Sequence, residues 1–169
     1  MNDMQFKPVL ESQTDQAYMI LCRRIDELIT KNTGQYTACY PDKATYINRN
    51  NNNENWCLLN DSGIVGIVSL TKNMIPEEWQ GIYNSSSNYW LSSFFVDTTE
   101  KGNGYGGIIL KECIKQAKIE GIKEILLDCY MDSVFLVPYY EKNGFVKIAE
   151  KRFKYGAREF SAGLMNKKI

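Results

Sequence analysis

Apolar side chains recur at helical spacing through residues 14–31, which predicts an amphipathic helix. Thr14 is a good N-cap for this helix, and Gly34 follows shortly after its end. A second, shorter helix is expected after Pro41, ending in the asparagine-rich run at 48–53. Because asparagine side chains compete with helical hydrogen bonds, we expect that run to be a solvated connection.

Short β-prone runs separated by turn residues occupy much of the remaining chain. They predict strands at 4–10, 56–59, 64–70, 89–96, 125–130, 145–148 and 159–165, with helices at 108–119 and 133–142. Residues 60–63 are typical of a hairpin turn, and Pro138 should distort or delay the helix that contains it. The order of elements predicts one α+β domain over residues 1–169, with a mixed sheet and helices on both faces.

The charge balance narrows the choice of partners. The chain has 20 basic and 20 acidic side chains, so no overall field attracts nucleic acid or an anionic membrane. No apolar stretch approaches the roughly 20 residues needed to span a bilayer. The first residues also lack the basic and apolar regions of a signal peptide. We therefore expect a cytoplasmic protein that binds neither nucleic acid nor membrane.

The cysteine and histidine content restricts the chemistry. The cysteines are odd in number and form no CxxC pair, which fits neither a disulfide framework nor a zinc site; they are Cys22, Cys39, Cys57, Cys113 and Cys129. We expect all of them to be reduced. The chain contains no histidine, which excludes Ser-His-Asp and Cys-His nucleophiles and histidine-bound metals. We expect no metal, and proton transfer must use carboxylates, tyrosines, lysines, a cysteine or water.

Four glycines, Gly102, Gly104, Gly106 and Gly107, lie between a predicted strand and a predicted helix. Glycines there allow positive φ and close approach of a ligand to the backbone, and the N-terminus of a helix attracts phosphate. A Walker loop would continue with lysine and then serine or threonine, but Ile108 follows the last glycine. That loop is therefore excluded.

A dinucleotide fingerprint, GxGxxG, is formally present at 102–107, with Asp128 near the expected distance downstream. That fingerprint normally opens a long βαβ array. Here hairpin-like strands precede it, and residues 108–169 are too few to complete such a sheet. A nucleotide-dependent enzyme and a purely structural turn both remain as alternatives.

The glycine cluster resembles the acetyl-CoA loop of the GNAT N-acetyltransferase superfamily. The family pattern Arg/Gln-x-x-Gly-x-Gly/Ala corresponds to Lys101-Gly102-Asn103-Gly104-Tyr105-Gly106, preceded by Phe94-Phe95-Val96. A second family pattern, Tyr-x-x-x-Gly-Phe, is matched by Tyr140-Glu141-Lys142-Asn143-Gly144-Phe145. Lys101 replaces the usual arginine or glutamine, and Ser133 stands where many members have a cofactor-binding asparagine.

The resemblance implies an α+β GNAT-like fold: a single-domain, mixed, mostly antiparallel sheet with a splayed central strand pair. It implies an acceptor-side half at 1–88 and an acetyl-CoA-binding half at 89–150. The backbone at 94–96 would pair with the pantetheine arm and polarise the thioester carbonyl. The implied cofactor-binding residues are Phe94, Phe95, Val96, Lys101, Gly102, Asn103, Gly104, Tyr105, Gly106, Gly107 and Ser133.

The resemblance also implies catalytic roles. Tyr140 would protonate the departing thiolate or bind the sulfur, with Tyr139 as a rival. Asp128 interrupts an apolar run, and some family members have a carboxylate at the corresponding point of this strand. Asp128 is therefore the leading candidate for the general base. The alternative is a structural ion pair between Asp128 and a lysine. An insertion at 72–88 and the strand after it offer aromatic walls and carboxylates for the acceptor amine, namely Trp79, Tyr83, Tyr89, Trp90, Glu77 and Glu78. For each of these residues, packing within the loop or an ordinary surface charge is the favoured alternative.

The expected function is direct transfer of acetyl from acetyl-CoA to a primary amine on a small molecule or a peptide, with homodimerisation left open. The alternative is a non-catalytic CoA-binding sensor or regulatory module of the same fold, which the departures at Lys101 and Ser133 favour. Nothing in the sequence selects among amine acceptors.

Overall fold

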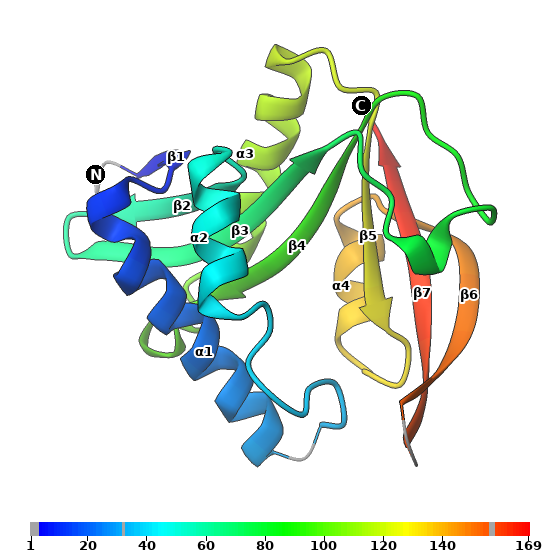
Figure 1. Cartoon of the computed structure of the whole chain (residues 1–169). Coiled ribbons are helices and arrows are strands. Elements are labelled where there is room, and N and C mark those ends of the chain that lie inside the picture. The colour runs from blue at the N-terminus through cyan, green and yellow to red at the C-terminus, as the bar shows by residue number, and fades with distance from the viewer. Residues whose placement is uncertain (1–3, 32, 156–157) are drawn as a thin grey trace. The chain divides into compact units, whose positions relative to one another are not determined.

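The computed structural model describes residues 4–31, 33–155 and 158–169. Its strands are β1 (Gln5–Pro8), β2 (Asn55–Asn60), β3 (Gly63–Lys72), β4 (Asn88–Val96), β5 (Glu124–Tyr130), β6 (Val146–Tyr155) and β7 (Arg158–Lys168). Its α-helices are α1 (Thr14–Thr30), α2 (Lys43–Asn51), α3 (Tyr105–Ile119) and α4 (Leu136–Lys142). Short 3₁₀ helices are η1 (Glu11–Gln13), η2 (Glu77–Trp79) and η3 (Thr98–Glu100) (Figure 1). No helix in these described ranges is long and apolar enough to cross a membrane.

The described strands form one sheet in the order β1-β2-β3-β4-β5-β7-β6. The pairs β1–β2, β2–β3, β5–β7 and β6–β7 are antiparallel, and β4–β5 is parallel. This confirms the mixed, mostly antiparallel sheet. The β4–β5 pairing runs from Asn88 opposite Glu124 to Trp90 opposite Leu126. Those residues stand at the start of both strands, as expected for a central pair that shares only part of its length.

The chain divides into two compact units. Unit 1 comprises residues 1–70 and 91–113, and unit 2 comprises residues 71–90 and 114–169. Most of β4 and the first part of α3 belong to unit 1. The insertion at 71–88 and the strands β5, β6 and β7 belong to unit 2.

The core of unit 1 forms where α1 packs on the sheet. The apolar stripe of α1 faces the core, as its helical spacing predicts. Ala17, Ile20, Leu21 and Ile25 are fully buried, and Leu28 and Ile29 at its C-terminal end are half-buried against the same cluster. Tyr46 of α2 belongs to the same cluster, together with Val9, Cys57, Ile64, Ile67 and Phe95. The helix α2 begins after Asp42, whose Oδ1 accepts a hydrogen bond from the Thr45 N–H at 2.8 Å.

The opposite face of the same strands contacts α3. A Cβ atom on Gly66 of β3 would lie 2.6 Å from Ile109 Cδ1 and 3.1 Å from the Phe95 carbonyl oxygen. Glycine at this position therefore allows α3 and β4 to approach β3 closely. Figure 1 shows α1 and α2 on one side of β2 and β3, with α3 on the other. Helices on both faces of the sheet are thus confirmed in unit 1.

One buried cluster of unit 2 lies on one face of β5 and β7. Its residues come from η2, β4, β5 and β7, and they are Trp79, Trp90, Leu126, Ala162 and Leu164. The other face of these two strands is also buried, with Ile125, Leu127 and Met165 at most 1% exposed. On the same chain, α4 begins at Leu136 rather than at Ser133. Pro138 then stands in the first turn, where its missing N–H has no intrahelical partner to lose. The expected late start of this helix is confirmed.

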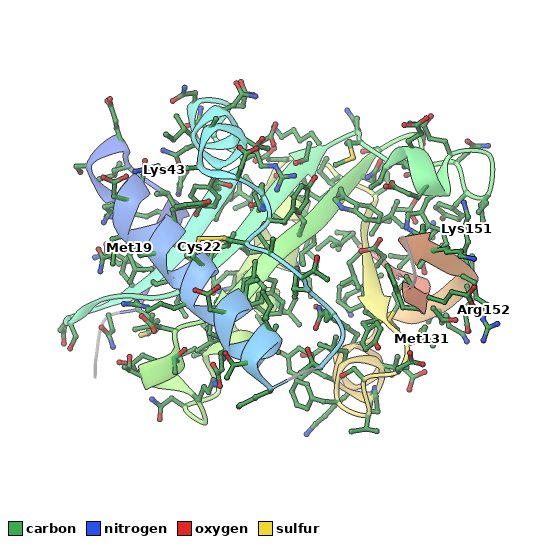
Figure 2. The ribbon with its side chains drawn as sticks, turned by 60° about the horizontal axis from the view of Figure 1, so that its bottom comes forward. Met19, Cys22, Lys43, Met131, Lys151 and Arg152 are labelled. Atoms are coloured by element: carbon green, nitrogen blue, oxygen red, sulfur yellow. A yellow bond between two sulfur atoms is a disulfide. The ribbon has the colours of Figure 1, made fainter. Side chains whose placement is uncertain are left out.

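A disulfide in unit 1 corrects one expectation. Cys22 of α1 is bonded to Cys39, with their Cα atoms 5.4 Å apart (Figure 2). The prediction of five reduced cysteines was wrong for this pair, because the chain after α1 folds back along the helix and brings the two residues together. Cys57, Cys113 and Cys129 are free and buried, as expected.

Candidate active site

The glycine loop of unit 1 connects η3 to α3. Gly102 has φ 86° and Gly104 has φ 77°, a left-handed conformation that residues with a Cβ rarely adopt. A Cβ atom added at Gly102, Gly104 or Gly107 would meet nothing within 4 Å. Backbone conformation therefore explains the first two glycines, and the space beside all three is open to a ligand.

The backbone N–H groups of this loop are available to an anion. Gly107 N–H donates back to the Gly104 carbonyl oxygen at 3.1 Å, which starts α3. Within the described residues, the N–H groups of residues 102–106 donate to no protein acceptor. Free N–H groups at the N-terminus of a 15-residue helix carry partial positive charge. These residues fit the pyrophosphate of acetyl-CoA.

Lys101 precedes the loop, but its ammonium group contacts α1. It forms an ion pair with Glu27, which also binds Lys31 at 2.7 Å and pairs with Arg24. The hydrogen bond from Lys101, followed by that from Lys31, lowers the pKa of Glu27 to about 2. The Lys101 side chain thus ties the loop to α1.

A second ion pair holds the end of β4. Arg23 Nη2 lies 2.8 Å from Asp97 Oδ2, and the Asp97 N–H donates to the Val65 carbonyl oxygen at 2.9 Å. Arg23 and Glu27 stand four residues apart on one face of α1, so this face holds both ends of the connection from β4 to the glycine loop. Sequence reasoning missed both residues, although their i, i+4 spacing was a signal for a shared role.

The β4 residues expected to contact the cofactor are also in unit 1. Phe95 is buried in the core against Tyr36, at a ring-centroid distance of 6.3 Å, while Phe94 and Val96 are half-buried. Ser93 before them has φ 49°. A left-handed residue inside a strand interrupts the regular pleat and redirects the backbone groups next to it. The pattern around 89–96 gave no sign of this.

Asp128 lies in unit 2, on β5 opposite Leu164 of β7. Its partner is an indole rather than a lysine: Trp79 Nε1 donates to Asp128 Oδ2 at 3.0 Å. The side chain is accessible to solvent, yet the protein around it desolvates the carboxylate and raises its pKa. The Trp79 hydrogen bond opposes this rise, and the negative charge of Glu78 adds to it.

Tyr140 stands near the C-terminus of α4 and is 7% exposed. The helix ends in a Schellman motif, in which Phe145 N–H donates to the Tyr140 carbonyl oxygen at 3.0 Å and Gly144 N–H donates to that of Glu141 at 2.9 Å. Gly144 has φ 82°. The rings of Tyr140 and Phe145, 5.6 Å apart, form the apolar contact that accompanies this motif. The Tyr-x-x-x-Gly-Phe pattern is therefore a helix ending that positions Tyr140.

Ser133 caps the N-terminal end of α4. Its hydroxyl oxygen accepts hydrogen bonds from the N–H groups of Leu136 at 3.2 Å and Phe135 at 3.4 Å. Tyr139, the rival of Tyr140, is half-buried, and burial raises its pKa. Unit 2 thus holds Asp128, Ser133 and Tyr140, and unit 1 holds the expected residues of β4 and the glycine loop.

Three of the aromatic side chains considered for an acceptor wall pack in the core instead, which was the favoured alternative. Trp79, Tyr89 and Trp90 are at most 4% exposed and belong to the core. Tyr83 donates its hydroxyl hydrogen to Glu124 Oε2 at 2.8 Å. Their spacing did not distinguish an aromatic pocket from aromatic packing, because both need large apolar side chains. Glu77 and Glu78 are exposed.

One family of known proteins matches most of this chain. The profile of the acetyltransferase (GNAT) family matches residues 23–145, a span that includes the glycine loop, Asp128 and Tyr140. No curated protein matches the sequence. In the described residues, no group of three or more cysteine, aspartate or glutamate side chains is placed to hold a metal ion.

Solved structures show the same fold at low sequence identity. A GNAT-family acetyltransferase from Listeria monocytogenes 4b F2365 has a TM-score of 0.78 and 14% identity, covering 98% of this chain and 95% of that one. The ribosomal-protein-S18-alanine N-acetyltransferase from Escherichia coli has a TM-score of 0.71 and 13% identity, covering 99% and 94%. The NatC complex bound to Gag peptide and CoA has a TM-score of 0.69 and 17% identity, covering 99% of each chain.

The family match spans most of the chain and contains both motifs, the glycine loop at the start of α3 and the tyrosine-bearing end of α4. The chain therefore belongs to the acetyltransferase (GNAT) family of acyl-CoA-dependent N-acyltransferases.

Proposed function

We propose that this protein transfers the acetyl group of acetyl-CoA directly to a primary amine on a small molecule or a peptide. Membership of the family supports acyl transfer from acetyl-CoA in general. The proposal adds that the acceptor is a primary amine and that the transfer is direct. The observation that supports it most is the glycine loop, where the N–H groups of residues 102–106 face no protein acceptor. Residues 1–169 would act as one acetyltransferase domain, with the acceptor side at 1–88 and the cofactor side at 89–150.

Several residues would hold the cofactor. The N–H groups of 102–106 would bind the pyrophosphate, and the backbone of 94–96 would bind the pantetheine arm, with Ser133 contributing its hydroxyl hydrogen. When bound, acetyl-CoA supplies an acetyl thioester to the reaction. Lys101 would act through the loop, because its ammonium group is already paired with Glu27.

Two side chains would move protons. The acceptor amine is mostly protonated at neutral pH and must lose a proton before it attacks. Asp128 would take this proton, since its carboxylate is accessible and its raised pKa makes it a stronger base than an ordinary aspartate. Tyr140 would donate its phenolic proton to the departing sulfur.

A thermal-shift assay tests cofactor binding. Acetyl-CoA at millimolar concentration should raise the Tm of the wild-type protein, and Gly104→Glu should abolish the increase by adding a side chain and a negative charge to the loop. Gly121→Glu is the matched control, because Gly121 also has a positive φ, of 68°, and also has open space beside it. No shift in the wild type would contradict acetyl-CoA binding.

An amine panel tests catalysis and the acceptor together. It should include polyamines, amino sugars, lysine peptides and a peptide that begins with alanine, the last because one similar structure is a ribosomal-protein-S18-alanine N-acetyltransferase. Release of free CoA thiol above the hydrolysis background identifies the acceptor. Acetyl-CoA binding without thiol release on any amine would instead support the non-catalytic sensor.

The cytoplasmic location and the homodimer are also proposals. Structural disulfides are rare in the reducing cytosol of most organisms, so the Cys22–Cys39 bond weighs against the location. Thiol labelling of protein from rapidly quenched cells would decide the redox state, and sedimentation would decide the oligomeric state.

A further inference from the structure

We propose that Trp79 is a positioning residue: its indole N–H holds the carboxylate of Asp128 in the orientation in which it accepts a proton from the acceptor amine. This inference rests on the proposed function, in which Asp128 is the base. It assigns a role to the insertion between β3 and β4, for which the sequence pattern suggested only an aromatic wall or loop packing.

The indole of Trp79 is rigidly held. Its side chain is 0% exposed, and its ring meets that of Phe153 edge-on at 5.8 Å. The backbone turns tightly around it, because Trp79 N–H donates to the Pro76 carbonyl oxygen at 2.9 Å and the Ile82 N–H donates to that of Trp79 at 3.1 Å. Because both the ring and the backbone of Trp79 are held in place, its indole N–H restricts the orientation of the Asp128 carboxylate.

The insertion carrying Trp79 is itself fastened to β5. Tyr83 donates to Glu124 Oε2 at 2.8 Å, and Asn166 Nδ2 and Lys168 Nζ reach the same oxygen at 3.1 Å and 2.7 Å. Glu124 and Asp128 are four residues apart on β5, so their side chains share one face of the strand. The insertion therefore contacts this face at two points, and only the Asp128 point is accessible to solvent.

The chemistry of the contact favours the charged carboxylate. An indole N–H is a donor only, so it stabilises an oxygen that carries no proton. It acts against the desolvation of Asp128 and against the charge of Glu78. Lys151 of β6 reaches the Glu78 carbonyl oxygen at 3.1 Å, and Cys129 points to the opposite face of β5. Of the groups that face Asp128 from η2, Trp79 alone favours ionisation.

The variant Trp79→Phe tests the inference, because it keeps an aromatic ring and removes the N–H. The profile of kcat/KM against pH, measured by thiol release with the best amine of the panel, should have its acid limb about one pH unit higher than the wild type. At pH values above that limb, kcat/KM should return to near the wild-type value. Ionisation of the amine contributes equally to both profiles, so a difference reports the enzyme.

Trp90→Phe is the matched control, since Trp90 is buried in the same cluster and the same substitution is made. Its acid limb should coincide with that of the wild type. If Trp79→Phe lowers kcat/KM equally at all pH values and leaves the acid limb in place, Trp79 is only a packing residue and the inference is overturned.

A second readout does not depend on turnover. The ¹H–¹⁵N signal of the Trp79 indole, identified by its loss in Trp79→Phe, should shift as Asp128 titrates and should stop shifting in Asp128→Asn. If the enzyme is active but the Trp79 indole signal does not shift with pH, the inference about Trp79 is overturned and the proposed function is not. An inactive protein with a titrating signal overturns the proposed function, and with it the catalytic purpose of the contact.

Discussion

Tyr139 and Tyr140 are neighbours in α4, but their side chains have different surroundings. Tyr140 packs against Phe145, whereas Tyr139 stacks on the exposed Phe135 with ring centroids 5.3 Å apart. The motif spacing singled out Tyr140 because the fifth residue after it completes the Schellman ending. At the residue scale, the preference for Tyr140 over Tyr139 thus has a local physical reason.

The variant Tyr140→Phe tests the role of the hydroxyl. It keeps the ring that packs on Phe145, so the fold and the affinity for acetyl-CoA should be preserved. Loss of a general acid typically costs 10²–10⁴-fold, and we expect kcat to fall by about 10²-fold. Steady-state kinetics and calorimetric titration with CoA measure the two effects, with Tyr139→Phe as the matched control. Unchanged turnover in Tyr140→Phe would remove Tyr140 from the mechanism.

At the scale of elements, α1 does more than bury an apolar stripe. Its polar face binds the connection from β4 to α3 through Arg23 and Glu27. Helical periodicity predicted the buried side of α1, but the partners of its polar side lie more than 70 residues later. Periodicity describes one element and carries no information on which distant charge will meet it.

The variant Glu27→Gln should destabilise the protein in a pH-dependent way. The folded pKa of Glu27 is about 2, below its ordinary 4.5. Its ion pairs therefore stabilise the fold fully above about pH 4.5, and this contribution is lost as the pH falls toward 2. We expect a loss of about 1 kcal/mol in the free energy of unfolding at pH 7.

Urea unfolding at pH 7 and at pH 3 measures this difference, which should be smaller at pH 3. Asp15→Asn is a matched control on the same helix, because Asp15 pairs with Lys43 at 2.9 Å but is 77% exposed. A loss that is equal for both variants at pH 7 would show that the Glu27 cluster adds nothing to an ordinary surface pair.

The C-terminal end of α4 gives another prediction for an element. Gly144→Ala places a Cβ on a residue with φ 82° and against the ammonium end of Lys167, which should cost about 1–2 kcal/mol of stability. Gly121→Ala should cost about 1 kcal/mol, since its φ is 68° and the space beside it is open. Only Gly144→Ala should also lower kcat, because it disturbs the turn that positions Tyr140. Equal kcat values in the two variants would show that this turn does not contribute to catalysis.

At the scale of the whole molecule, the Cys22–Cys39 disulfide should contribute to stability. It closes a loop with a sequence separation of 17, and a bond across such a loop typically stabilises by about 3 kcal/mol. Reductant should therefore lower the Tm of the wild type. The double variant Cys22→Ser/Cys39→Ser should have this lower Tm with or without reductant. A wild type whose Tm is insensitive to reductant, with all five thiols free to react, would contradict the bond.

The sheet was predicted well where strands are buried and poorly at its edge. The run 125–130 differs from β5 by one residue, because a buried strand is nearly all apolar. The run 145–148 covers only the start of β6, which extends to Tyr155. The missed part is rich in lysine and arginine, as suits an edge strand that must not pair with another chain. Figure 2 marks two of these residues, Lys151 and Arg152.

The sequence by itself determined the features that depend on neighbouring residues. These include the buried stripe of α1, the left-handed glycines at 102 and 104, and the Schellman ending at Gly144. Each follows from backbone conformation or helical spacing within a few residues, so the two family motifs were recognisable without the fold.

Only the tertiary structure decided which distant side chains meet. The Trp79–Asp128 hydrogen bond, the Lys101–Glu27 ion pair and the Cys22–Cys39 bond each join separate elements or loops. Such contacts depend on the packing of the whole core. In the sequence, an aromatic or charged residue that lines a site cannot be distinguished from one that supports the site from behind. For that reason the proposed donor site could be predicted from the sequence, whereas the contact that supports the proposed base is visible only in the fold.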